Sequence, residues 1–175
     1  LAHDPAHDRD RLALINNVLH RANISGLTVL DDGRPLALGN IASTCSRTPD
    51  KSGPLVSVIV PVRNGGSTLE FSLRSLTQQT HANLQVIVVD DASEDETPRI
   101  LDLIARADDR IVVHRLERHS GPYAARNAGL RIAQGVFVTV HDADDWSVPE
   151  LVELQVRALT QSDHQANFSC WVRCG

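Results

Sequence analysis

Residues 56–62, with the sequence VSVIVPV, are the feature that most limits what this chain can fold into. β-Branched apolar side chains at nearly every position suit a strand buried on both faces, as in a parallel sheet. Further apolar runs follow at residues 84–89, 111–116 and 136–140, and amphipathic, helix-like stretches separate them. We therefore predict an α/β domain with a mostly parallel, Rossmann-like sheet and helices on both faces.

Local signals mark the start of the first two helices. Ser67 and Glu70 have the spacing of a capping box, which predicts a helix from there to Gln79. Thr97 followed by Pro98 indicates an N-cap and a first-turn proline.

Two more helices and one more strand complete the predicted order. A helix is expected over residues 123–133, closed by Gly135 in a left-handed conformation. Another helix is expected over 149–159, and residues 167–172 fit a fifth strand.

The chain divides near residue 53. Its 175 residues are 42% hydrophobic, which suffices for one buried core. Residues 1–53 contain one modest amphipathic pattern, over 11–22, and end in a polar stretch rich in Ser, Thr and Pro. We expect an N-terminal extension and linker over 1–53, without chemistry of its own, and the α/β domain over 54–175.

Composition excludes several classes of function. A net charge of −5 and an aromatic content of 3% argue against nucleic-acid binding. No apolar run approaches the ~20 residues of a membrane span, and the polar N-terminus lacks a signal-peptide core. Cys45, Cys170 and Cys174 form neither an even disulfide framework nor a full zinc set, and Cys170 and Cys174 are expected to be lone thiols of a reducing cytosol rather than half of a metal site. The expected location is the cytoplasm, with peripheral attachment to the inner membrane face left open.

Acidic residues follow two of the predicted strands. Asp90 and Asp91 end the second strand, and Asp142, Asp144 and Asp145 follow the fourth. The carboxyl ends of parallel strands share one edge of the sheet, where ligands bind. Converging carboxylates repel one another, and a Mg²⁺ or Mn²⁺ ion bound to a diphosphate would relieve that repulsion. Asp142 and Asp144 are two apart and so project to the same side, whereas Asp145 suits a turn or cap.

Six segments extend this pattern in a fixed order. They are VSVIVPVRN (56–64), SLTQQT (75–80), VIVVDDASED (86–95), GPYAARNAGL (121–130), AQG (133–135) and DADDWSVP (142–149). Over residues 55–160 the chain resembles the first half of a family-2 glycosyltransferase with the GT-A fold. The resemblance implies an inverting transfer of a sugar from a nucleoside-diphosphate sugar, with UDP expected, to a saccharide or other hydroxyl acceptor. It also implies a role in polysaccharide biosynthesis.

The same resemblance implies a role for individual residues. Pro61 borders the nucleotide base, and Asp91 hydrogen-bonds the uracil ring. Asp142 lies near the ribose and diphosphate, and Asp144 ligates the divalent metal ion. Arg126 faces the donor, where its charge suits phosphate. The general base of the family is expected beyond residue 175, so the domain is expected to be truncated at its C-terminus and incomplete for catalysis.

Some positions depart from the family pattern. Arg63 stands where an aromatic residue often covers the base, although a guanidinium can also stack on a ring. His141 stands at a usually apolar position, and a packed, hydrogen-bonded histidine is favoured there over a catalytic one. Glu150 and Glu153 are interpreted as favourable first-turn acids of the helix after Pro149.

Other functional classes fit less well. A non-catalytic glycosyltransferase-like module of a larger synthase stays open as an alternative. A phosphate-accepting receiver domain needs its acidic pair after strand one and a lysine after strand five, whereas the chain's only lysine is Lys51 in the linker. A dinucleotide dehydrogenase is excluded because no Gly-x-Gly-x-x-Gly follows the first strand.

Overall fold

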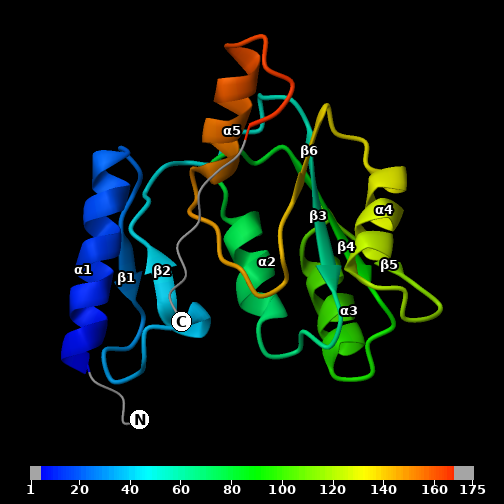
Figure 1. Ribbon diagram of the computed structural model, residues 1–175, viewed down its shortest axis with the longest axis horizontal. Coiled ribbons are helices and arrows are strands. Elements are labelled where there is room, and N and C mark those ends of the chain that lie inside the picture. The colour runs from blue at the N-terminus through cyan, green and yellow to red at the C-terminus, as the bar shows by residue number, and fades with distance from the viewer. Residues whose placement is uncertain (1–4, 168–175) are drawn as a thin grey trace.

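The computed structural model describes residues 5–167. In chain order its elements are α1 (Pro5–Arg21), β1 (Leu27–Val29), η1 (Leu38–Asn40), β2 (Ile41–Ser43), β3 (Val56–Val62), α2 (Leu69–Thr77), β4 (Leu84–Asp90), α3 (Thr97–Ala107), β5 (Ile111–Arg115), α4 (Pro122–Ile132), β6 (Phe137–Val140) and α5 (Leu151–Thr160). Figure 1 shows the larger sheet at the centre right, with α1, β1 and β2 beside it on the left.

The central sheet is parallel throughout. Within the described residues it has four strands in the order β5-β4-β3-β6. Val58 lies opposite Val86 of β4 and Thr139 of β6, so β3 is paired on both sides and lies inside the sheet. The predicted parallel α/β sheet is confirmed. All four strands therefore end at one edge, which is where the following loops meet.

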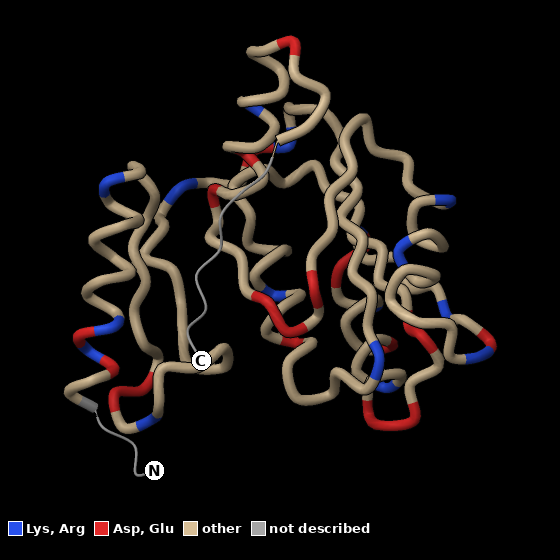
Figure 2. The backbone as a smooth tube through the Cα atoms, in the orientation of Figure 1, with Lys and Arg blue, Asp and Glu red and all other residues tan. Residues whose placement is uncertain are grey.

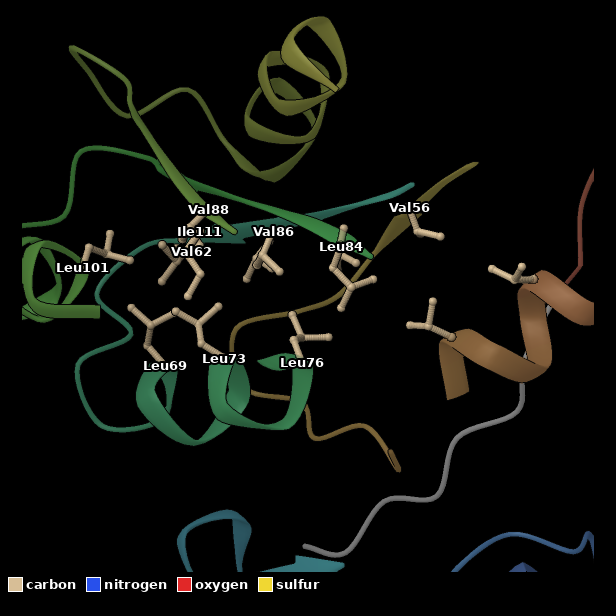
Figure 3. Packing of buried hydrophobic residues seen from close by; sticks show 14 residues of the cluster. Val56, Val62, Leu69, Leu73, Leu76, Leu84, Val86, Val88, Leu101 and Ile111 are labelled. Carbon is tan, nitrogen blue, oxygen red and sulfur yellow. The ribbon is translucent and has the colours of Figure 1, made fainter. Parts of the chain in front are cut away.

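Helices cover both faces of this sheet, as predicted. On one face, buried side chains of β3 and β4 pack against α2, α3 and α5. Figure 3 shows Leu69, Leu73 and Leu76 of α2 pointing toward this face, with α4 on the opposite side of the sheet. On the α4 side, Ala125 and Ala128 pack against a second cluster of sheet residues. Burial of alternate side chains on the two faces stabilises the sheet and fixes its register.

Two predicted helix caps are wrong. The capping box over 67–70 does not form, because α2 begins after Thr68, whose side chain makes no capping hydrogen bond within the described chain. The N-cap of α3 is Glu96, so Thr97 is the first residue inside that helix. Thr97 is fully buried, and its hydroxyl accepts a hydrogen bond from the Gly65 N–H at 2.9 Å. It links the loop after β3 to α3 rather than capping its own helix.

Gly135 is also required for a different reason from the one predicted. The φ angle of Gly135 is not positive. Ala133, the C-cap residue of α4, already has an extended conformation. A Cβ atom at Gly135 would lie 2.5 Å from the Ser57 nitrogen and 2.6 Å from the Phe137 oxygen. The Gly135 N–H also donates to the Ser57 hydroxyl at 2.8 Å. Close backbone approach to β3 therefore demands glycine here.

The N-terminal segment forms a small unit of its own. Strands β1 and β2 pair antiparallel, and α1 packs against β1. Two contacts fasten this unit to α5: the Ser25 N–H donates to Glu150 at 3.0 Å, and Arg47 lies 2.7 Å from Glu153. The division at residue 53 stays a prediction.

The predicted helix over 149–159 is present as α5. The fifth strand predicted over 167–172 lies, except for Asn167, outside the described residues, as do Cys170 and Cys174. Cys45 is a free thiol.

Candidate functional site

The loops after β3, β4, β5 and β6 enclose a cleft of about 540 Å³ at the carboxyl edge of the sheet. All six residues proposed from the sequence line it: Pro61, Arg63, Asp91, Arg126, Asp142 and Asp144. Figure 2 shows acidic segments among the loops that follow the strands. A single concave site therefore collects side chains from positions more than eighty residues apart in the chain.

Asp91 is a buried acid within this cleft. It is 3% exposed, and its carboxylate accepts hydrogen bonds from the Ser120 N–H at 2.7 Å, the Gly121 N–H at 2.8 Å and His119 at 2.7 Å. Burial by itself raises the pKa of Asp91, but these hydrogen bonds outweigh it and hold the pKa below its usual value. An ionised carboxylate has about four acceptor positions, so roughly one is left for a ligand. Its role in base recognition stays a prediction.

His119 lines the cleft beside Asp91 and was not predicted from the sequence. Its side chain is 56% exposed, and Nδ1 lies 2.7 Å from Oδ2 of Asp91. Because the ionised carboxylate can only accept, Nδ1 carries a proton and donates it to Asp91, and Nε2 is an acceptor whenever the ring is neutral. The available signal was position, since His119 follows β5 at the same edge of the sheet as the acidic residues.

Arg126 and Asp142 form an ion pair across the cleft. The guanidinium of Arg126 on α4 lies 2.8 Å from Oδ1 of Asp142, which follows β6. The same guanidinium lies 5.8 Å from the centre of the Tyr123 ring, a cation–π contact. The Asp142 side chain is 50% exposed, so water screens the pair. Arg126 can therefore turn toward an incoming phosphate group at small cost.

Asp144 is the acid most available to a cation. Among the described residues, no hydrogen bond or ion pair engages its side chain, which lines the cleft. The structure has no group of three or more His, Cys, Asp or Glu residues within 5–167 that could hold a metal ion unaided. Mg²⁺ and Mn²⁺ fit such a site, because they use one or two carboxylates and complete their shell with phosphate oxygens and water.

The loops after β3 and β4 are joined at the base of the cleft. The Asn64 side chain accepts a hydrogen bond from the Glu94 N–H at 2.9 Å, and the Asn64 N–H donates to Ser93 at 2.9 Å. Arg63 lies 3.8 Å from Glu94. Asn64 has φ of 51° and Ala92 has φ of 55°, so both occupy the left-handed region. For Ala92 this is a strained conformation, which the surrounding contacts hold in place beside Asp91.

Three further sequence interpretations concern residues outside the lining of the cleft. His141 is 7% exposed and hydrogen-bonded, so the packed interpretation is confirmed. Glu153 lies in the first turn of α5, as expected. Glu150 is instead the N-cap residue of α5, is 5% exposed and holds Ser25.

The fold and the cleft together define an α/β protein with a cleft at the carboxyl edge of a parallel sheet, the place where proteins of this class bind ligands. The model of glycosyl transferase family 2 matches residues 57–175, and the chain therefore belongs to that family.

Curated relatives are named as glycosyltransferases. A putative teichuronic acid biosynthesis glycosyltransferase, TuaG of Bacillus subtilis, is 37% identical over 116 residues, covering 66% of this chain and 46% of the relative. Glycosyltransferase GlyG of Streptococcus pneumoniae is 32% identical over 109 residues, covering 62% and 36%. The chain thus spans less than half the length of these relatives.

Solved structures of similar proteins have the same fold. S. aureus TarS in complex with UDP matches with a TM-score of 0.57 and 34% identity, over 61% of this chain and 32% of that one. The mannosyltransferase PcManGT from Pyrobaculum calidifontis, in complex with GDP-Man and Mn²⁺, matches with a TM-score of 0.51 and 32% identity, over 58% and 31%. The predicted GT-A type of fold is confirmed. Within residues 5–167, no helix combines the length and apolar character needed to cross a membrane.

Proposed function

We propose that this chain is the donor-binding part of an inverting glycosyltransferase that transfers a sugar from a nucleoside-diphosphate sugar to a hydroxyl group of a saccharide acceptor. The observation that carries the proposal is the meeting of Asp91, Arg126, Asp142 and Asp144 in one cleft. TarS was solved with UDP and with UDP-GlcNAc, and PcManGT with GDP-Man and Mn²⁺. These complexes support a nucleotide-sugar ligand, and we favour UDP as the nucleotide.

The cleft has two chemically different ends, which suggests how the donor lies. Asp91 offers a hydrogen-bond acceptor, and His119 a ring nitrogen beside it, that suit the N–H and hydroxyl groups of a nucleoside. Pro61, near the end of β3, and Arg63, in the loop after it, line the cleft and offer packing surface to a base. Arg126, with Asp142 and Asp144, suits a diphosphate and its cation. We therefore place the base near β4 and β5 and the diphosphate between α4 and the loop after β6.

Transfer of a sugar develops positive charge on the sugar ring and negative charge on the departing diphosphate. A divalent ion bound there supplies Lewis-acid stabilisation of that negative charge. Asp144 is the residue that would hold it, and Arg126 would turn from Asp142 to the phosphate oxygens as their charge grows. The acceptor hydroxyl needs a general base on the opposite face of the sugar, and we expect that base outside the residues lining this cleft. A role in polysaccharide biosynthesis and a cytoplasmic location are part of this proposal.

Calorimetric titration with UDP and GDP, with and without Mn²⁺, tests the proposal. UDP should bind more tightly in the presence of Mn²⁺, and Asp144→Asn should remove that gain. Asp109→Asn, an exposed acid in the turn before β5, is the matched control and should bind as the wild type does. Equal binding with and without Mn²⁺, or an unaffected Asp144→Asn variant, would contradict the proposed metal-bound donor.

A further inference from the structure

We propose that His141 is a positioning residue, which fixes the turn over residues 142–145 and thereby sets where the Asp142 and Asp144 carboxylates stand in the cleft. The proposal rests on the proposed function and deepens it, because it assigns the alignment of the carboxylates to a residue that does not itself line the cleft.

The first step is the placement of the His141 ring. His141 is 7% exposed and sits between the turn and α2. Its Nε2 lies 3.0 Å from the Ser72 hydroxyl oxygen and 3.3 Å from the Asp145 carbonyl oxygen, and its Nδ1 lies 3.2 Å from the Ser147 hydroxyl oxygen. Every polar atom of the ring therefore has a partner.

The second step is the direction of these hydrogen bonds. The Asp145 carbonyl can only accept, so Nε2 carries the proton and donates toward Ser72 and Asp145. Nδ1 of the neutral ring then accepts from the Ser147 hydroxyl. The Ser72 hydroxyl is left free to donate to the Asp142 carbonyl, 3.2 Å away. A relay of hydrogen bonds thus runs from Ser147 through His141 and Ser72 to the first residue of the turn.

The third step is the effect on the turn. Its first carbonyl, that of Asp142, accepts from Ser72 and from the Asp145 N–H at 3.0 Å. Its last carbonyl, that of Asp145, lies against the imidazole. The His141 N–H donates to the Ile59 carbonyl at 3.0 Å, which fastens the start of the turn to β3. The His141 ring and the Ser72 hydroxyl to which it is hydrogen-bonded therefore tie both ends of the turn to α2, and the His141 backbone N–H ties its start to the sheet.

The fourth step is the charge of the ring. Burial lowers the pKa of His141, which outweighs the opposing effects of the Asp145 carbonyl and of the Asp142 and Asp144 carboxylates. The direction of this shift agrees with the hydrogen bonds, in which Nδ1 carries no proton and accepts from the Ser147 hydroxyl. Replacing a group that holds a metal-ligating residue in place commonly lowers the metal affinity about 10- to 100-fold.

The test compares His141→Leu with His141→Gln, which keeps a donor and an acceptor. Amide hydrogen exchange over residues 141–147, measured without ligand, should speed up in His141→Leu and return toward the wild-type rate in His141→Gln. The affinity for UDP with Mn²⁺ should fall about 10- to 100-fold in His141→Leu and largely recover in His141→Gln.

His81 provides a matched control. It is 6% exposed, its Nε2 lies 2.9 Å from the Pro54 carbonyl oxygen, and it is not part of the cleft. His81→Leu should change neither exchange over residues 141–147 nor affinity. Ser72→Ala removes the other member of the relay without replacing the histidine, and it should reproduce the faster exchange and the weaker binding.

Wild-type exchange over residues 141–147 in His141→Leu and in Ser72→Ala would overturn the proposal, as would equally fast exchange in His81→Leu. Faster exchange with unchanged UDP and Mn²⁺ affinity would also overturn it. Wild-type protein that binds no UDP would contradict the proposed function instead, and the exchange measurement would still decide whether His141 holds the turn.

Discussion

Oδ2 of Asp91 lies 2.7 Å from Nδ1 of His119, so a buried acid at the end of β4 fixes the ring of a half-exposed histidine beyond β5. The same carboxylate also holds the backbone N–H groups of Ser120 and Gly121, just before α4 begins. This arrangement orders the loop between β5 and α4 and leaves Nε2 of His119, which does not contact Asp91, for a ligand.

Replacing His119 with alanine should weaken UDP binding about tenfold, the loss expected for one hydrogen bond to a ligand group. Because more than half of the side chain is exposed, the melting temperature should change little. Calorimetry and thermal unfolding measure the two effects separately. His164→Ala, an exposed histidine after α5, is the control. Unchanged affinity in His119→Ala would show that His119 does not contact the nucleotide.

Replacing Asp91 with alanine should lower both the affinity for UDP and the stability of the fold. It leaves the N–H groups of Ser120 and Gly121 without their acceptor, which we expect to destabilise the fold by about 2–4 kcal/mol. Urea denaturation gives that value from the shift of the midpoint at constant slope. A loss below about 0.5 kcal/mol would contradict the anchoring role, since that is the ordinary effect of a surface substitution.

Replacing Arg126 with glutamine should weaken binding of UDP but not of uridine, because the guanidinium is placed to contact phosphate. Competition binding of the two ligands checks this prediction. Arg131→Gln, at an exposed position near the end of α4, should leave both affinities unchanged. Equal weakening of uridine and UDP by Arg126→Gln would show that Arg126 acts through the loop structure and not through the phosphates.

Gly135→Ala should destabilise the fold by about 1–3 kcal/mol, because the added Cβ meets backbone atoms of Ser57 and Phe137 that have no room to move. Gly33→Ala serves as the control, since its Cβ would meet only the Asp31 side chain, at 3.2 Å. Thermal unfolding of both variants decides the matter, and equal melting temperatures would contradict the predicted close contact.

Stability should fall in mild acid because of His141. Burial holds the pKa of His141 below its ordinary value of 6.5, so the unfolded chain binds this proton more readily than the folded one. The stability that depends on a neutral His141 is therefore fully present above pH 6.5. It is lost as the pH falls toward the lower pKa of the folded state, by at most about 1.4 kcal/mol per pH unit. In metal-free buffer, the wild type should lose more stability than His141→Gln between about pH 7 and pH 5. If the stability of the wild type and of His141→Gln fell equally with pH, a buried neutral histidine would be ruled out.

The order of strands and helices could be predicted from the sequence because it depends on the apolar pattern, which is strong in β3 and β4. The acids at the strand ends were predictable for the same reason, since a parallel sheet brings its carboxyl ends together. Cap assignments failed where a tertiary partner decided the outcome. Thr97 accepts a hydrogen bond from the Gly65 N–H, and the Gly135 N–H donates to the Ser57 hydroxyl. Both partners are distant in the chain.

His119 was overlooked for a related reason. Its position after β5 places it at the same edge of the sheet as the acidic residues, but its neighbours in sequence do not distinguish it from an ordinary loop histidine. Its contact with Asp91 exists only in the folded chain. A partner 28 residues earlier cannot be inferred from local pattern.

A crystal structure with UDP and Mn²⁺ tests the central claim most directly, through the anomalous signal of the manganese ion. We predict a manganese peak within bonding distance of Asp144, with the diphosphate beside Arg126 and the uracil ring next to Asp91 and His119. Nucleotide bound elsewhere on the protein, or a manganese ion with no contact to Asp144, would contradict the account.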